Sequence, residues 1–175
     1  MKLISATALA LTVLASGYSV AAAPELHVHK TVTINASADK VWNLVKDFNG
    51  LNTWHPAVAK DDIVEGTNNT VGAVRLLSLK GGGTIKEKLL AFDATGHSFR
   101  YAIVEGVLPV SNYSSRLSVK SAGAGKSTVS WSGKFQRKNL GDNPGDSEND
   151  KTAVDTVTGV YQGGLDTLKK MAEAQ

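Results

Sequence analysis

The feature that most constrains the fold is a series of short, turn-separated β-type runs that ends in a long amphipathic segment. Between residues 61 and 137 the apolar runs are separated by Gly- and Asn-containing turns at intervals of roughly ten residues, which is typical of an antiparallel meander. The predicted strands cover residues 63–65, 71–79, 84–92, 98–105, 113–121 and 128–137. Nothing in this stretch has the strand and helix alternation of a parallel crossover unit.

The final segment has the three- and four-residue apolar spacing of a helix. Val157, Tyr161, Leu165 and Leu168 mark its apolar face, and we expect a long helix over about residues 151–172. Glycines interrupt this segment at positions 159, 163 and 164. Because each costs a helix about 1 kcal/mol relative to alanine, their presence indicates either close approach to a neighbouring element or a bend.

Ahead of the meander, residues 26–34 alternate as a half-buried strand does. Ser37 is a candidate N-cap for a helix of about ten residues that ends near Gly50. Residues 51–54 are expected to form one more short helical turn, which Pro56 stops.

The first residues have the pattern of a secretory signal. Lys2 precedes an apolar run over residues 3–14, and small residues follow up to Ala23. The run is too short to span a bilayer. We therefore expect residues 1–22 to be a signal peptide that is removed, residues 23–175 to form a single domain, and the mature protein to be periplasmic without stable membrane insertion.

Composition and motifs exclude several classes of site. The chain has no Cys, which rules out disulfides, thiolate metal sites and a thiol nucleophile. With 19 cationic and 16 anionic residues, it lacks the strong basic excess usual for nucleic acid binding. No nucleophile elbow or phosphate loop is present. We expect no metal, no cofactor and no nucleic acid partner.

Two weaker metal candidates have simpler explanations. His27 and His29 share one strand face, but no third ligand lies nearby in the sequence, so an exposed strand face is expected. The acidic stretch from Asp142 to Asp150 lacks the alternating oxygen ligands of a calcium loop. It is interpreted as a solvated connector whose acids suit the following helix N-terminus.

Glu87 is the informative exception to the strand pattern. It shares its parity with Ile85, Leu89 and Ala91, the more apolar face of its strand. A carboxylate buried there requires a partner or a raised pKa. Glu87 is therefore either a polar group inside a pocket or an edge carboxylate, solvated or paired with Arg75 or Arg100.

The sequence Trp54-His55-Pro56 falls where the short helices meet the sheet. His55 could act there as a proton shuttle or ligand donor, although a lone His is more often structural. His55 and Glu87 are the only catalytic candidates, and both are weak. Hydroxyls of Tyr113, Ser115 and Tyr161 would suit a ligand with one or two polar groups, or ordinary core packing.

The order of elements resembles the helix-grip fold of the SRPBCC superfamily, which includes START domains, polyketide cyclases and birch-pollen-allergen-like proteins. The residues that carry the resemblance are 41–48, Trp54-His55-Pro56, 87–93 and 105–113. They look like the exported branch that includes MxaD, the accessory protein of bacterial methanol oxidation. The resemblance implies an α+β fold with a curved antiparallel sheet of about seven strands wrapped around the C-terminal helix, with two short helices after the first strand.

A second similarity, to plant abscisic acid receptors, covers residues 112–115 and 143–157. It implies that a ligand cavity is lined by Glu87, Tyr113, Ser115, Ser132 and Tyr161. Trp54 and His55 are expected at one mouth of this cavity, where the short helices meet the sheet. The receptor lysine that binds the hormone carboxylate aligns with Ala59, and the receptor gate loop is replaced by a shorter segment at residues 80–83. A cavity is implied, but hormone perception is not.

Three functions follow from these resemblances. The first is a non-enzymatic periplasmic accessory protein, MxaD-like, that supports electron transfer from methanol dehydrogenase to a cytochrome c. The second is a carrier or sensor of a small apolar ligand or lipid. The third is an enzyme of the polyketide cyclase or dehydratase kind, in which His55 or Glu87 moves protons.

Overall fold

The computed structural model of the protein describes residues 23–174. Within this range, one antiparallel sheet of seven strands contains the β-structure, in the order β1-β7-β6-β5-β4-β3-β2. Its strands are β1 (Leu26–Ile34), β2 (Val58–Glu65), β3 (Val74–Leu79), β4 (Thr84–Asp93), β5 (Ser98–Gly106), β6 (Val110–Gly123) and β7 (Lys126–Arg137). The chain therefore pairs its first strand with its last, and every other neighbour in the sheet is also a neighbour in sequence.

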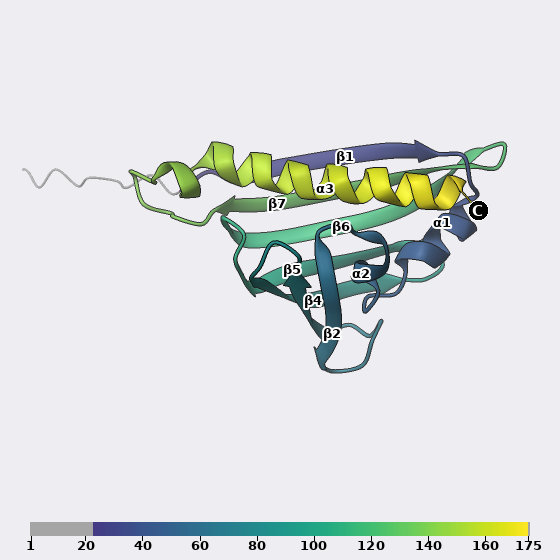
Figure 1. Ribbon diagram of the computed structural model, residues 1–175, viewed down its shortest axis with the longest axis horizontal. Coiled ribbons are helices and arrows are strands. Elements are labelled where there is room, and N and C mark those ends of the chain that lie inside the picture. Colours follow the sequence, from purple (N-terminus) through teal and green to yellow (C-terminus); the bar gives the residue numbers. More distant parts are fainter. Residues whose placement is uncertain (1–22, 175) are drawn as a thin grey trace, which may run out of the picture.

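The helices lie on one face of this sheet. They are α1 (Ala38–Val45), α2 (Leu51–Trp54), the 3-10 turn η1 (Asp146–Glu148) and α3 (Asp150–Glu173). The sheet curves around the long helix α3, which runs beside β1 and β7, and α1 lies near the C-terminal end of α3 (Figure 1). The end of α2 meets the middle of α3 near Val160. The helix-grip fold expected from the resemblance is thus confirmed.

Side-chain caps mark where α1 and α3 begin, although α1 ends at Val45, before the expected end near Gly50. The Ser37 side chain accepts a hydrogen bond from Lys40 N–H at 3.3 Å and so caps α1. The Asn149 side chain caps α3 in the same way, by accepting from Thr152 N–H at 2.9 Å. Helix α3 exceeds the expected range of residues 151–172 by one residue at each end.

Strand β2 departs most from expectation. It begins at Val58, whereas the sequence pattern predicted a strand only from residue 63. The polar run Lys60-Asp61-Asp62 does not have the alternating pattern from which a strand is predicted. The residue that is buried in the core is Asp61, where the pattern would have an apolar residue. The strand lies at the sheet edge and its pairing with β3 is irregular at two points, which suits such a run.

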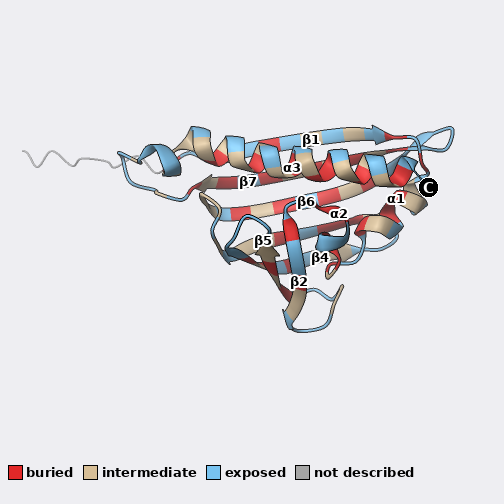
Figure 2. Ribbon diagram, viewed as in Figure 1, coloured by how far each residue is buried: buried red, intermediate tan, exposed pale blue. Residues whose placement is uncertain are grey.

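Buried side chains gather between the sheet and α3 (Figure 2). On α3 they include Val157, Tyr161, Leu165 and Leu168, the face predicted from the spacing, together with Ala153. Gly164 belongs to the same face, and a Cβ built there would lie 2.7 Å from the His55 ring and 2.8 Å from the Trp131 ring. Close approach of a neighbour therefore explains this glycine.

Candidate functional site

An internal cavity of about 70 Å³ lies between the concave face of the sheet, α2 and α3. Its wall consists mainly of apolar and aromatic side chains, with Glu87 and His55 as the polar exceptions. The lining residues are Leu51, His55, Ala57, Val58, Leu77, Leu79, Ile85, Glu87, Tyr101, Ile103, Leu108, Tyr113, Trp131 and Val160. An apolar cavity with one carboxylate can select a ligand by a single polar contact.

Glu87 owes its place in the wall to a buried arginine on the neighbouring strand. Arg75 lies directly opposite Glu87 in the β3–β4 pairing, and its Nε and Nη2 approach Glu87 Oε2 at 2.8 and 2.6 Å. Both side chains are almost fully buried. Both contacts go to Oε2, and among the described residues no side chain donates a hydrogen bond to Oε1. Glu87 is also one of the residues that line the cavity.

Arg75 also contacts two further parts of the chain. Its Nη1 donates to the Phe48 carbonyl oxygen at 2.6 Å and approaches Asp61 Oδ2 at 3.4 Å. Its guanidinium also lies over the Phe48 ring, 4.2 Å from the ring centre. Asp61 Oδ2 accepts a second hydrogen bond, from Leu51 N–H at 2.9 Å, at the start of α2. One cation therefore ties β3 to β2, β4 and the segment before α2.

Burial and mutual contact govern the protonation of Glu87, Asp61 and Arg75. Removal from water raises the pKa of Glu87 and of Asp61, and the adjacent Arg75 charge opposes the shift in both. The two carboxylates raise the pKa of Arg75 against its own desolvation, so the guanidinium stays charged. Of the two cations that sequence reasoning offered to Glu87, Arg75 is its partner, whereas Arg100 is exposed.

A cluster of hydroxyl groups supports the aromatic wall. Tyr161 OH lies 2.6 Å from Tyr113 OH and 2.8 Å from Ser115 Oγ, which also donates to the Ser132 carbonyl oxygen at 2.9 Å. Trp131 Nε1 lies 3.0 Å from both Tyr101 OH and Ser115 Oγ. The Trp131 and Tyr161 rings stack with centres 4.5 Å apart.

These hydroxyls remain neutral. Burial raises the pKa of Tyr101 to about 12 and raises those of Tyr113 and Tyr161 above the ordinary value. Tyr101 and Tyr113 face the cavity, whereas Tyr161 and Ser115 lie behind them and orient them. The cluster can offer hydrogen bonds to a ligand, but it contains no base that would turn a hydroxyl into a nucleophile.

His55 lines the cavity, but the backbone occupies both of its ring nitrogens. Nε2 lies 3.0 Å from the Val160 carbonyl oxygen on α3, and Nδ1 accepts from Ala57 N–H at 3.2 Å. Only the neutral tautomer with the proton on Nε2 satisfies both contacts. In this arrangement His55 fixes the end of α2 against α3, and neither nitrogen is left for a proton relay.

Burial lowers the pKa of His55 below its ordinary value, and the charges of Arg75 and Lys80 act in the same direction, whereas the Val160 contact opposes the shift. We therefore expect the native state to resist protonation that the unfolded chain accepts near pH 6.5. The free energy of unfolding should therefore be highest above about pH 6.5. Below that pH it should fall by up to about 1.4 kcal/mol per pH unit, until the lowered pKa of His55 is reached.

Urea denaturation between pH 5 and 8 measures this slope. His55→Asn should flatten it, whereas His29→Asn, at an exposed position of β1, should leave it unchanged. Equal slopes in the wild type and in His55→Asn would show that His55 takes up its proton without unfolding the protein.

The remaining sequence candidates fall outside the cavity wall. Trp54 is buried and packs against Trp131, with ring centres 5.6 Å apart. The Ser132 side chain lies on the opposite face of the sheet, because it alternates with the inward-facing Trp131 and Gly133. Only its carbonyl oxygen reaches the hydroxyl cluster. The assignment of the Ser132 side chain to the cavity is therefore wrong.

Sequence reasoning did not single out Asp61, Tyr101 or Trp131, and it treated Arg75 only as a possible ion-pair partner. A signal did exist for Arg75, which shares its strand parity with the buried Leu77. Tyr101 likewise shares the parity of Phe99, and Trp131 that of Val129 and Phe135. Asp61 has no such signal, because the other buried residue of β2, Val58, lies three positions away and so does not share its parity. The pairing of β2 with β3 is irregular between the two.

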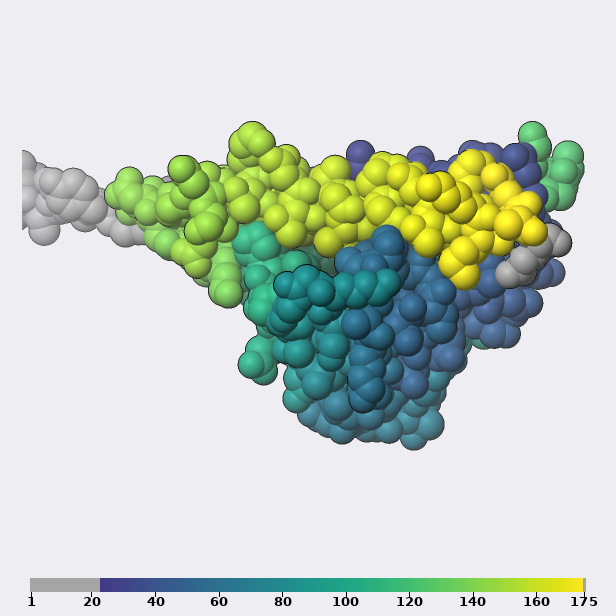
Figure 3. All heavy atoms as spheres, in the orientation of Figure 1, coloured from purple at the N-terminus to yellow at the C-terminus, as the bar shows by residue number. Residues whose placement is uncertain are grey.

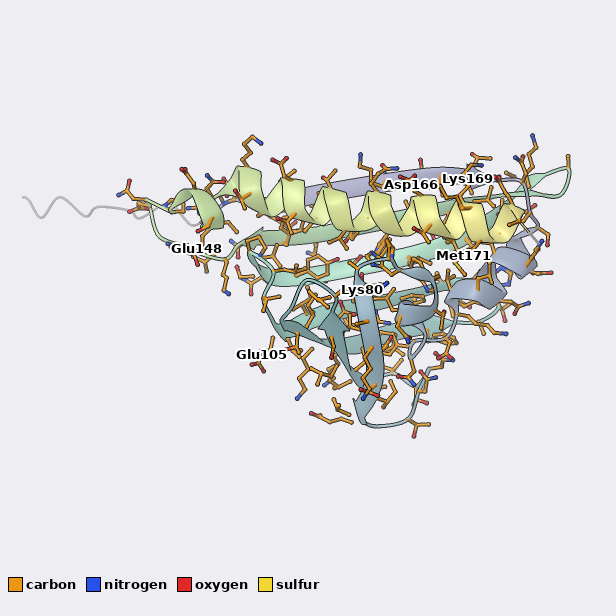
Figure 4. All side chains as sticks on the ribbon, in the orientation of Figure 1. Lys80, Glu105, Glu148, Asp166, Lys169 and Met171 are labelled. Atoms are coloured by element: carbon orange, nitrogen blue, oxygen red, sulfur yellow. The ribbon has the colours of Figure 1, made fainter. Side chains whose placement is uncertain are left out.

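Two loops lie at the rim of the cavity. The β3–β4 turn is joined to the start of β2 by a hydrogen bond from Lys80 N–H to the Ala57 carbonyl oxygen at 2.9 Å. Gly83 in this turn, at φ +81°, packs against Val107 of the β5–β6 loop so closely that a Cβ would lie 2.7 Å from it. Figure 4 labels Lys80, which belongs to the β3–β4 turn, and Glu105, which precedes the last residue of β5.

The described residues also bear on metals and membranes. No group of three or more His, Cys, Asp or Glu side chains among residues 23–174 could hold a metal ion. Among the helices of the same range, none is both long enough and apolar enough to cross a membrane. The proposed signal peptide, residues 1–22, lies outside the described residues.

Comparison with solved structures gives near full-length matches. XoxI from Bacillus cereus is 31% identical over 83% of this chain and 94% of its own, with a TM-score of 0.72. An uncharacterized protein from Bacillus thuringiensis is also 31% identical, over 84% of this chain and 98% of its own, with a TM-score of 0.73. An aromatase/cyclase from a Streptomyces species, ZhuI, is 21% identical with a TM-score of 0.68, which shows a shared fold alone.

A protein family described as polyketide cyclase / dehydrase and lipid transport matches residues 25–173, nearly everything from β1 to the end of α3. The match includes every residue of the cavity wall. On this match and on the helix-grip architecture, the chain belongs to the polyketide cyclase / dehydrase and lipid transport family of the SRPBCC superfamily.

Proposed function

We propose that this protein is a non-enzymatic binding protein whose internal cavity holds a small, largely apolar ligand with one hydrogen-bond donor. The observation that carries the proposal is Glu87, which lines a mostly apolar cavity and whose contacts with Arg75 use Oε2 alone, so that among the described residues Oε1 accepts no hydrogen bond from a side chain. An O–H or N–H group of the ligand would donate to Oε1, and the aromatic side chains would contact its apolar body.

The size of the cavity restricts the ligand. At about 70 Å³ the cavity is smaller than the ~150 Å³ that accepts benzene in an engineered protein core. A ligand of phenol size therefore requires the rim side chains to move. Leu79, Ile103, Leu108 and Val160 are the large apolar wall residues that are partly exposed, so the opening would involve them first.

Thermal unfolding in the presence of phenols, quinones and fatty acids tests this proposal. A ligand that binds only the folded state adds about 2.7 kcal/mol at a concentration of 100 times its Kd. Glu87→Gln should weaken the binding of an active compound about tenfold, a loss of about 1.4 kcal/mol. The amide oxygen can still accept from Arg75, and the amide nitrogen then presents a donor where the ligand needs an acceptor.

Glu105→Gln, which changes an exposed carboxylate at the end of β5, is the matched control and should bind as the wild type does. Equal affinities of Glu87→Gln and the wild type for the same compound would exclude Glu87 as the recognition group. Absence of any thermal shift across the compounds would remove the binding function itself.

The finer assignment that we propose is an exported accessory role in methanol oxidation, in which the protein assists electron transfer from methanol dehydrogenase to a cytochrome c. It is supported by the resemblance of residues 41–56 and 105–113 to the MxaD-like branch, and the leader pattern of residues 1–22 supports a periplasmic location. Purified protein should raise the rate of cytochrome c reduction by methanol dehydrogenase. An unchanged rate over a series of salt concentrations would remove this role.

An enzymatic role in cyclisation or dehydration has less support from the site. Of its two proton-transfer candidates, His55 has both nitrogens bonded to the backbone, which leaves Glu87 alone. If the protein did turn over a polyketide-like chain, Glu87→Gln should abolish the reaction and His55→Asn should not.

A further inference from the structure

The face of the sheet that points away from α3 has an unusual distribution of charge. Strands β1, β6 and β7 contain no Asp or Glu, and neither does β5 from Ser98 to Ala102. The strand alternation brings several basic side chains to the outer face of this region: His27, His29, Arg100, Arg116, Lys120 and Lys134. We call these residues the basic face.

The helical side of the molecule is different. Helix α3 forms a continuous band over it (Figure 3), and its charges of both signs are interspersed. Lys151 pairs with Asp155 and Lys169 pairs with Glu173 along the helix. The chain as a whole carries a formal net charge of only +3, so the positive charge of the basic face reflects segregation and not composition.

A hollow of about 320 Å³ lies in the middle of the basic face. Its floor is formed by small residues, including Ser114, Ser132 and Gly133, and its rim by Arg100, Arg116, Lys134 and His27. No acidic residue is among the residues that line it. Glu25 at one end pairs with Lys134 at 3.2 Å and with His27 at 3.3 Å.

The two arginines have no such partner. Arg100 lies directly opposite Arg116 in the β5–β6 pairing, and like charges in this position repel each other. Arg116 Nη2 donates to Ser98 Oγ at 2.9 Å, and within residues 23–174 neither arginine forms an ion pair with an acid. The fold therefore keeps two repelling guanidinium groups beside a hollow without an internal carboxylate to neutralise them.

We propose that the basic face docks an acidic surface of a partner protein, whose Asp or Glu side chains enter the hollow and pair with Arg100 and Arg116. A guanidinium group binds a carboxylate through two parallel N–H···O bonds, which makes arginine the suitable cation at such an interface. The small Ser and Thr side chains around the hollow, among them Ser118 and Ser130, allow close approach and offer hydrogen bonds.

The same face fits a protein better than it fits nucleic acid or a membrane. The outward positions of β1, β6 and β7 hold no Phe, Tyr or Trp on which bases could stack. They also lack the large apolar side chains that enter a lipid interface. The proposal is independent of the cavity ligand, because the sheet separates the hollow from the cavity.

Binding to immobilised poly-L-glutamate at low salt is the direct test, with Arg100→Gln/Arg116→Gln compared against Lys151→Gln/Lys170→Gln on α3. Both double variants lose the same charge. The arginine variant should bind about tenfold more weakly and depend less on salt, whereas the lysine variant should change by less than about twofold. Equal losses in the two variants would show general electrostatic attraction and would overturn the proposal.

A second variant keeps both arginines. In Ser132→Asp the introduced carboxylate lies opposite Arg116 in the sheet and neutralises the hollow from its floor, so binding to poly-L-glutamate should fall to a similar degree without loss of the fold. Duplex DNA and phosphatidylglycerol vesicles are the competing probes. Tighter arginine-dependent binding to either one than to poly-L-glutamate would contradict an acidic protein as the partner.

Discussion

Replacing Arg75 by methionine is expected to lower the free energy of unfolding by about 3–5 kcal/mol at neutral pH. Methionine fills much of the volume of the arginine stem, but it leaves Glu87 and Asp61 buried without a cation. It also removes the hydrogen bond to the Phe48 carbonyl oxygen that holds the segment before α2. Urea denaturation followed by tryptophan fluorescence measures the loss.

The loss should depend on pH in a defined direction. Without Arg75, the main influence that opposes the burial of Glu87 and Asp61 is gone, so the pKa values of both rise further, although the Leu51 N–H still lowers that of Asp61. A carboxyl group whose folded pKa is raised contributes stability below its unfolded pKa of about 4, and that contribution is lost as the pH rises through the folded pKa. The gap between Arg75→Met and the wild type should therefore narrow on acidification from pH 7.

Arg100→Met is the control, because it removes the same side chain from an exposed position of a neighbouring part of the sheet. It should change the stability by no more than about 0.5 kcal/mol. Adding Glu87→Gln to Arg75→Met should recover part of the loss, since one buried carboxylate is then absent. If Arg75→Met were as stable as the wild type at every pH, the charged group would have no structural role.

The elements with a clear apolar period could be predicted from the sequence, because the residues that specify each of them lie within the element itself. Helix α3 shows its apolar spacing over six turns, and β1 and the Ser37 cap need no information from elsewhere in the chain. Strand β2 was predicted only in part, because its inward residue is Asp61. A charged residue at a core position contradicts the pattern from which strands are recognised.

The candidate site was less predictable, because pairing across strands creates it. Glu87 stands out by parity within β4, but its partner depends on the register between β3 and β4, which places Arg75 opposite it. His55 could be assigned a role only once Val160 and Ala57 were known to occupy its nitrogens. Ser132 was assigned from resemblance, although its neighbours Trp131 and Phe135 already indicated that it faces outward.

The glycines of α3 also separate what the sequence predicts from what only the structure shows. Because each glycine costs helix stability, the sequence indicates that some of them have a packing role, but it does not show which one contacts a neighbouring element. At Gly164 a Cβ would lie within 2.8 Å of two rings, whereas at Gly159 it would meet nothing within 4 Å. At Gly163 the nearest atom is a Pro56 carbon at 3.8 Å, an ordinary contact.

Gly164→Ala and Gly159→Ala should therefore change the stability in opposite directions. Gly159→Ala should raise the free energy of unfolding by up to about 1 kcal/mol, because alanine is the better helix former. Gly164→Ala has the same intrinsic gain, but overpacking should cost about 1–3 kcal/mol. Neither neighbour can move freely, since His55 is bonded at both nitrogens and Trp131 Nε1 is bonded to two hydroxyls.

The expected difference between the two variants is thus about 1–3 kcal/mol, measurable by urea denaturation at pH 7.5, where His55 is neutral in both. Gly164→Ala should also alter the tryptophan fluorescence of the folded state, because its Cβ presses on Trp131. Equal stabilisation by both substitutions would mean that α3 can shift away from the sheet. The 70 Å³ cavity could then widen without strain, and its present size would not limit the ligand.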